Sequence, residues 1–155
     1  GYHGLGDVFV FIFFGPVSVL GTYYVQAGTI VPAAIWASLP MGFLITAILV
    51  VNNYRDLETD KKVGKRTLAV RLGPTGTQWE FFLLLMASGA VPLMMWLTRQ
   101  ASGWVLLSWL SFPLTLPLIK DIRTKKGSPL NATLAGTARL SLVYGLLFSL
   151  GYLLG

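Results

Sequence analysis

The chain has 155 residues, of which 54% are hydrophobic and 12% are charged, whereas soluble domains carry about 25% charged residues. This composition excludes an ordinary soluble domain, because the polar side chains are too few to cover its surface. The formal net charge of +6 does not indicate nucleic-acid binding, because most basic residues gather in two loops between apolar runs. The absence of cysteine excludes disulfide bridges and thiolate metal sites.

Long runs without charged residues predict the membrane spans. No Asp, Glu, Lys, Arg or His occurs between Val8 and Tyr54, and two further long runs of this kind follow before residue 120. Because a helix needs about 20 apolar residues to cross the hydrocarbon core, the first run is long enough for two spans. We predict an all-α, polytopic transmembrane bundle of about five helices, in a single domain over residues 1–155. The predicted spans are 8–25, 33–53, 79–97, 104–119 and 130–154.

The basic loops predict how the chain is oriented. The loop after the second span and the loop after the fourth lie on the same side, because two spans separate them. Their basic residues are Arg55, Lys61, Lys62, Lys65, Arg66 and Arg71 in the first loop and Lys120, Arg123, Lys125 and Lys126 in the second. The loop between the third and fourth spans, on the opposite side, holds only Arg99. Since Lys and Arg favour the cytoplasmic side, we predict an integral protein of the inner or plasma membrane with both basic loops in the cytoplasm.

Residues 54–78 form the most polar part of the chain and are expected to be its functional loop. Asn52, Asp56 and Asp60 are spaced by four around its start, so in a continuing helix they drift by only ~80° over ~12 Å. Their oxygens would then lie on one face, with Glu58 pointing away from it. Two carboxylates and an amide oxygen are hard ligands that suit Mg²⁺, whose shell is completed by waters and substrate phosphates.

Basic residues follow these acids directly, and Lys65, Arg66 and Arg71 are candidates for holding a phosphate group. Acidic residues followed by basic residues suit a metal–diphosphate site, because the metal removes the repulsion between carboxylates and phosphate. The competing interpretation is a solvated loop whose acidic and basic side chains neutralise each other. A Walker A loop is excluded, because Thr59 and Arg66 replace its first glycine and its Ser or Thr.

The segment from Asn52 to Ala69 reads Asn-Asn-Tyr-Arg-Asp-Leu-Glu-Thr-Asp-Lys-Lys-Val-Gly-Lys-Arg-Thr-Leu-Ala. It resembles the second aspartate-rich motif of the UbiA superfamily of intramembrane aromatic prenyltransferases. Residues 1–16 also resemble the span before that motif, and the order of spans is similar to the last five of the family's nine helices. Within the superfamily, the chain is most similar to the branch that prenylates 1,4-dihydroxy-2-naphthoate in menaquinone biosynthesis.

The resemblance implies transfer of a polyprenyl group from polyprenyl diphosphate to 1,4-dihydroxy-2-naphthoate, with loss of diphosphate and CO2. It implies that Asp56 and Asp60 are catalytic and bind Mg²⁺, with Asn52 assisting. The diphosphate-binding residues implied are Lys65, Arg66 and Arg71, of which the last has an alternative role as an anchor of the loop. The implied partners are the two substrates and the lipid bilayer.

Members of the superfamily carry two aspartate-rich motifs, whereas this chain has one and does not begin with Met. We therefore expect it to be the C-terminal part of a longer enzyme, whose N-terminal half supplies the other motif. The piece alone is expected to be inactive, because it holds half of an active site.

Two other functions remain open. The first is a UbiA-type prenyltransferase for another aromatic acceptor, such as a hydroxybenzoate. The second is a small membrane transporter or subunit without enzymatic activity. A proton-coupled transporter is disfavoured, because every acidic residue is expected at a span end or in a loop. Arg139, inside the last span, either reaches back to the interface or faces the bundle interior. His3 is not expected to act as a base, and the sequence identifies no general base.

Overall fold

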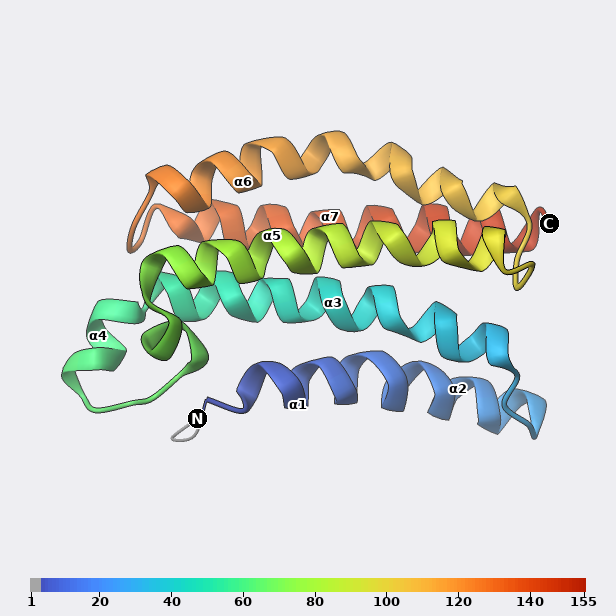
Figure 1. Ribbon diagram of the computed structural model, residues 1–155, viewed down its shortest axis with the longest axis horizontal. Coiled ribbons are helices and arrows are strands. Elements are labelled where there is room, and N and C mark those ends of the chain that lie inside the picture. Colours follow the sequence, from blue (N-terminus) through green and yellow to red (C-terminus); the bar gives the residue numbers. More distant parts are fainter. Residues whose placement is uncertain (1–3) are drawn as a thin grey trace.

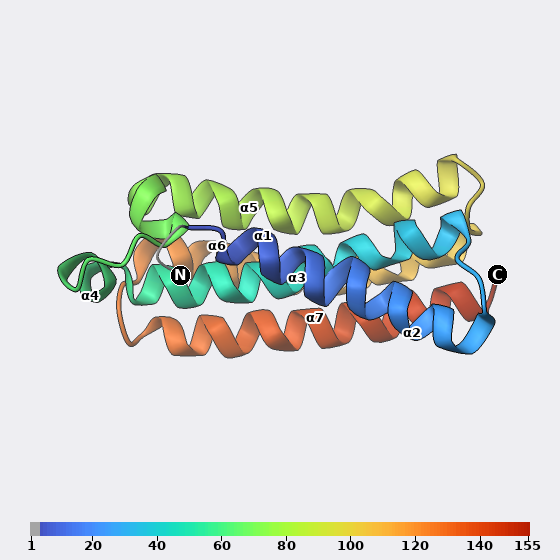
Figure 2. The same ribbon diagram turned by 90° about the horizontal axis from the view of Figure 1, so that it is seen from below.

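The computed structural model describes residues 4–155, so His3 lies outside the described residues. Within the described range all regular elements are helices, and five helical spans are long and apolar enough to cross a membrane. Figures 1 and 2 show these spans side by side along the long axis of the molecule, each antiparallel to the next. The predicted all-α transmembrane bundle of about five helices is therefore confirmed.

The helices follow one another in a simple order along the chain. The first span consists of α1 (Gly6–Ile12), the π-helical segment η1 (Phe13–Val17) and α2 (Ser18–Ala27). It is followed by α3 (Pro32–Arg55), the short α4 (Leu57–Lys62) and α5 (Leu68–Leu97). The fourth span consists of the 3₁₀-helical segment η2 (Gly103–Leu114) and α6 (Thr115–Thr124), and the last span is α7 (Leu130–Leu153).

Helix α5 begins well before the predicted third span, so the expected loop over 54–78 contains α4 and the first turns of α5. The early start follows from a cap, because the Thr67 hydroxyl accepts a hydrogen bond from the Val70 N–H at 3.3 Å. Gly73, at φ 68° and ψ −178°, then breaks α5 in a conformation that is essentially restricted to glycine. The turn before Gly73 packs beside α4 at one end of the bundle (Figure 1).

The fourth span is mostly a 3₁₀-helix, which is unusual because such helices rarely exceed 3–4 residues. Three side-chain hydroxyls add bonds to the carbonyl three residues earlier at 2.7–2.8 Å, those of Ser108, Ser111 and Thr115. Pro113 lies inside η2 and Pro117 lies inside α6, and each removes one backbone donor from this continuous span. The span continues past its first lysine to Thr124, because Leu118 and Ile122 are buried about one turn apart.

Close contacts between glycines join the first span to α3, which also contacts α5 and α7. A Cβ atom on Gly15 would lie 2.8 Å from the Cα atom of Gly42, and a Cβ atom on Gly42 would lie 2.8 Å from the Phe11 ring. A larger residue at either position therefore displaces one of the two helices. Helix association in membranes depends on close packing, and small residues at the contact allow the backbones to approach.

Contacts of the same kind join α5 to the last two spans. Gly89 leaves room for the ring of Phe112, and the Trp109 indole N–H donates to the Gly89 carbonyl at 3.0 Å. On the α7 side, the buried Tyr144 hydroxyl donates to the Ser88 carbonyl at 2.8 Å. These bonds satisfy the polar ends of two aromatic side chains inside an otherwise apolar bundle.

We predict that Gly15→Ala lowers the thermal midpoint of the purified protein in detergent, because the added methyl group overlaps Gly42. Gly21, in the same span, provides a matched control, since no atom lies within 4 Å of its Cβ position. Gly21→Ala should leave the midpoint unchanged or raise it, because alanine favours a helix over glycine by about 1 kcal/mol. Equal midpoints for the two variants would contradict the proposed importance of this contact.

Candidate active site

Both basic loops lie at the same end of the bundle. Figure 1 shows α4 and the turn between α6 and α7 at one end, and the turn between α5 and η2 at the other. The first end collects the basic residues over 55–71 and 120–126, whereas Arg99 lies at the opposite end. The acids of the predicted metal site therefore lie among most of the positive charge of the protein.

The end of α3 is built around the Arg55 guanidinium. Its Nη2 atom donates to Asn52 Oδ1 at 3.0 Å and to Asp56 Oδ2 at 2.7 Å, and its Nε atom donates to Asp56 Oδ1 at 2.8 Å. Helix α3 ends here, with Asp56 at φ −95° and ψ 6°, yet the Asp56 N–H still bonds to the Asn52 carbonyl at 3.2 Å. The side-chain oxygens of Asn52 and Asp56 therefore converge on one cationic nitrogen.

Arg55 also determines the charge of Asp56. Its hydrogen bond lowers the pKa of Asp56 below the ordinary carboxyl value, and the positive charges of Arg55 and Lys65 act in the same direction against partial burial. Because the folded-state pKa lies below the unfolded one, the pairing stabilises the fold above the ordinary carboxyl range. That contribution is lost as the pH falls through the folded-state pKa. Asp56 is therefore ionised at neutral pH, as an oxygen ligand for a metal requires.

Asp60 lies on α4 and pairs with a different cation. Its side chain is 10% exposed, and its Oδ1 atom accepts a hydrogen bond from Lys65 Nζ at 2.9 Å. The Asp60 N–H bonds to the Asp56 carbonyl at 2.8 Å, so helical hydrogen bonding continues from the end of α3 into α4. The two predicted catalytic acids thus belong to one helical path, and each is paired with its own basic residue.

A glycine turns the chain so that Lys65 reaches back to Asp60. Gly64 adopts φ 74°, its N–H bonds to the Lys61 carbonyl at 3.3 Å, and the Lys65 N–H bonds to the Asp60 carbonyl at 3.0 Å. This pair of bonds is a Schellman motif, which ends a helix with a left-handed residue that is usually glycine. No atom lies within 4 Å of the Gly64 Cβ position, so glycine is required for its conformation rather than for space.

Arg66 and Arg71, the other predicted diphosphate ligands, are exposed at the same end. Both approach Gly4, since a Cβ atom on Gly4 would lie 3.0 Å from Arg71 Nε and 3.1 Å from the Arg66 carbonyl. Among residues 4–155, neither guanidinium forms an ion pair with an acid. Arg71 therefore presents positive charge beside the start of the first span, where the backbone of Arg66 also lies.

The donor atoms at the end of α3 fit a divalent cation in part. The oxygens of Asn52 and Asp56 converge on one positive atom, and Mg²⁺ takes one or two protein carboxylates while water and phosphate oxygens complete its shell. In the part of the chain that the structure describes, no group of three His, Cys, Asp or Glu side chains is arranged to hold a metal. The described residues at the end of α3 therefore supply two oxygen-bearing side chains and not a complete set of metal ligands.

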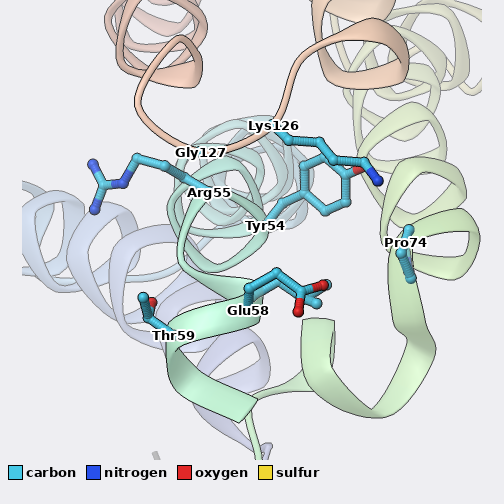
Figure 3. Close-up of a pocket in the computed structure, with 8 residues that line it drawn as sticks. Tyr54, Arg55, Glu58, Thr59, Pro74, Lys126 and Gly127 are labelled. Atoms are coloured by element: carbon cyan, nitrogen blue, oxygen red, sulfur yellow. The ribbon is translucent and has the colours of Figure 1, made fainter. Parts of the chain in front are cut away.

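A cavity of about 330 Å³ lies beside α4, and Glu58 is among the residues that line it. Figure 3 shows the Glu58 carboxylate between Tyr54 and Pro74, with Lys126 from the turn before α7 nearby, whereas the Arg55 side chain points to the opposite side. Glu58 thus lies away from the oxygens that Arg55 binds, as its spacing predicts.

Arg55 has a role that its place among the basic loop residues does not predict. Besides binding Asn52 and Asp56, Arg55 donates to Asn131 Oδ1 at 2.9 Å and so connects α3 to the start of α7. Its position directly before Asp56 was an available signal, because adjacent opposite charges at a helix end can pair. The contact with α7 had no signal in the local sequence.

Three charged residues, Glu80, Asp7 and Arg139, lie within the helical spans. The prediction that every acid lies at a span end or in a loop is wrong for Glu80, which lies inside α5 because that helix begins at Leu68. Asp7, at the start of the first span, was not singled out, yet it is 5% exposed. Arg139 is exposed on α7 among the described helices.

Known proteins are similar to this chain over all or most of its length. The model of the UbiA prenyltransferase family matches residues 1–143. The chain is 38% identical to 1,4-dihydroxy-2-naphthoate octaprenyltransferase of Escherichia coli (strain K12), over 99% of this chain and 50% of that protein. The identity is also 38% to the protein of the same name from Haemophilus influenzae, over 100% of this chain and 51% of that protein. The identity to UbiA prenyltransferase domain-containing protein 1 of Mus musculus is 32%, over 99% of this chain and 44% of that protein.

These comparisons decide the family. The chain spans about half the length of the curated relatives it matches, and the matched half of the naphthoate octaprenyltransferases is the C-terminal one. The motif around Asp56 and Asp60, the five spans and the matched family model all agree. The chain belongs to the UbiA prenyltransferase family.

Proposed function

We propose that the full-length protein transfers a polyprenyl group from polyprenyl diphosphate to 1,4-dihydroxy-2-naphthoate, with release of diphosphate and CO2. Relatives at 38% identity carry the name of an octaprenyltransferase for this acceptor. The structural observation that supports the proposal most is the convergence of the Asn52 and Asp56 oxygens on one cationic atom, on the same helical path as Asp60. A loop whose acidic and basic side chains neutralise each other would also contain the Arg55–Asp56 and Lys65–Asp60 pairs, so the match to the named relatives is what favours the proposed function over that alternative.

The charged residues have separate roles in the proposed reaction. Asp56 and Asp60, with Asn52, hold Mg²⁺, which neutralises the diphosphate and makes it a better leaving group. Lys65 and Arg66 bind the diphosphate oxygens and stabilise the negative charge that develops as the carbon–oxygen bond breaks. The positive metal can replace Arg55 and Lys65 as the partners of Asp56 and Asp60, and the negative diphosphate can replace Asp60 as the partner of Lys65.

Arg71 is proposed as a further diphosphate ligand. Its Nε atom and the backbone carbonyl of Arg66 both lie beside Gly4, so the Arg71 side chain is near the segment that carries Lys65 and Arg66. The planar guanidinium fork matches two phosphate oxygens, which favours arginine over lysine for a bidentate contact.

The apolar spans supply the surroundings that the proposed reaction needs. The ring carbon that bears the carboxylate gives an electron pair to the allylic carbon, and a carbon–carbon bond forms. The bond to the carboxylate then breaks, CO2 leaves, and the electron pair of that bond restores the aromatic ring. Water would capture an allylic cation, so the site benefits from the apolar bundle that begins directly below the charged end.

We further propose that the charged end faces the cytoplasm of an inner or plasma membrane. Both basic loops lie at this end, whereas the opposite end carries Arg99, and Lys and Arg favour the cytoplasmic side of a membrane. A polar diphosphate group then reaches the site from the cytoplasm, while the isoprenoid chain stays within the hydrocarbon core.

The aspartate-rich segment of this chain is proposed to be one of two that form the site. This proposal rests on the relatives, which the chain matches over about half of their length, and on the incomplete metal ligand set. Purified residues 1–155 are therefore expected to show no prenyl transfer in liposomes supplied with both substrates and Mg²⁺. Measurable transfer by this chain alone would refute the requirement for a second segment.

The decisive test is prenyl transfer by the full-length protein in membranes, with a long polyprenyl diphosphate, Mg²⁺ and 1,4-dihydroxy-2-naphthoate. Asp56→Ala and Asp60→Ala should each reduce the rate by about 100-fold or more, because each removes charge stabilisation from the leaving group. A chelator should abolish the wild-type reaction. Glu58→Ala is the matched control and should retain the rate within about twofold, since Glu58 points away from this site.

Other outcomes of this assay discriminate among the remaining functions. Prenylation of 4-hydroxybenzoate in preference to the naphthoate would show that the protein is a prenyltransferase with a different acceptor from the one proposed. Loss of activity in Glu58→Ala equal to that in Asp56→Ala would count against the assigned site. If no acceptor were prenylated by wild type, the proposed reaction would be wrong.

We also predict that Gly64→Ala reduces prenyl transfer although it removes no charged group. An alanine in the left-handed conformation costs about 1–2 kcal/mol, so the turn changes and Lys65 loses its position. Gly127→Ala is the matched control, because Gly127 also has a positive φ of 63° and open space around its Cβ position but lies in the other basic loop. Steady-state rates of the two full-length variants should differ clearly; equal rates would show that the Gly64 turn does not position Lys65.

A further inference from the structure

A buried carboxylate lies outside the site described above. Asp7, in the first turn of α1, is 5% exposed, and no described residue forms a hydrogen bond with its Oδ1 atom. Burying a carboxylate oxygen without a partner is costly, and polar groups held at this cost within a membrane span commonly have a binding role. Neither the metal site nor the diphosphate site uses Asp7.

Asp7 lines a cavity of about 120 Å³ at the charged end of the bundle. The polar walls of this cavity are Asn53, on the last turns of α3, and Thr67, which caps α5. Asn53 directly follows Asn52, and Thr67 directly follows Arg66. The cavity therefore lies between the two elements that carry the proposed metal and diphosphate ligands.

The chemistry of the cavity selects a hydrogen-bond donor. A carboxylate offers only acceptor atoms, and the other polar side chains of the cavity are those of Asn53 and Thr67. The ionised diphosphate and the ring carboxylate also offer only acceptor atoms, and the isoprenoid chain has no polar group. Among the groups that the proposed substrates offer, this leaves the hydroxyls of the aromatic ring.

We propose that this cavity binds a ring hydroxyl of the aromatic acceptor and that Asp7 accepts its hydrogen bond. The inference rests on the proposed function and adds the part of the site that recognises the acceptor. A hydrogen bond to a carboxylate fixes the ring beside the diphosphate ligands and increases the electron density of the ring carbon that attacks. The hydroxyl proton remains on its oxygen, so the atom balance of the reaction is unchanged.

Binding of two probes to the full-length protein in detergent tests this inference. The probes are 1,4-dihydroxy-2-naphthoate, kept anaerobic, and 2-naphthoate, which lacks both hydroxyls. Wild type should bind the first about 10-fold or more tightly than the second, and Asp7→Asn should remove most of this preference, because it replaces an acceptor oxygen by an amide NH₂ group, which is a donor. Glu58→Gln is the control and should retain the wild-type ratio. The KM for polyprenyl diphosphate should change by less than about twofold in Asp7→Asn.

A structural role for Asp7 would give a different result. Because no described residue bonds to its Oδ1 atom, Asp7→Asn should not lower the thermal midpoint of the protein without the acceptor. A lower midpoint with an unchanged ratio of probe affinities would overturn the inference, as would an unchanged ratio alone. Binding needs no turnover, so this outcome is distinct from a failure of the proposed reaction. If the proposed reaction were wrong and this inference right, wild type would transfer no prenyl group, yet its preference for the hydroxylated probe would still depend on Asp7.

Discussion

The hydrocarbon core of a membrane offers no water to a backbone N–H or carbonyl, so these groups must bond within the protein. Every span of the chain is accordingly helical, including the 3₁₀ segment η2, where side-chain hydroxyls form additional bonds to carbonyls. The same medium makes charge costly, and most acidic and basic residues lie at one end of the bundle. A charged region suited to a diphosphate therefore adjoins an apolar region suited to an isoprenoid chain.

At the charged end, oppositely charged side chains hold one another in position. Arg55 binds both Asn52 and Asp56, and Lys65 binds Asp60 through a turn that depends on Gly64. In the proposed reaction a metal and a diphosphate replace these internal partners, so the ligands are ordered before the substrate arrives. Such preorganisation lowers the cost of stabilising the leaving group.

Glycines act in two different ways in this bundle. Gly15 and Gly42 allow the first span and α3 to approach, and a side chain at either position would separate the helices. Gly64 and Gly73 have open space around their Cβ positions, but their backbone conformations disfavour any other residue. The first pair brings Asp7 on the first span close to α3, and the second pair shapes the segment that carries Lys65, Arg66 and Arg71. The cavity between α3, α5 and the first span depends on both.

The sequence by itself determined the class of structure, the number of spans and the family, because apolar runs of membrane length and the motif from Asn52 to Ala69 are local features. It also determined that Glu58 and Asp56 face different sides, since helical periodicity follows from spacing alone. Only the tertiary structure decided that Arg55 reaches Asn131, that Glu80 lies inside a span and that Asp7 lines a cavity with Asn53 and Thr67. These relations join residues far apart in the chain, or depend on where a capped helix begins. Packing between helices determines these relations, and no local pattern of residues encodes that packing.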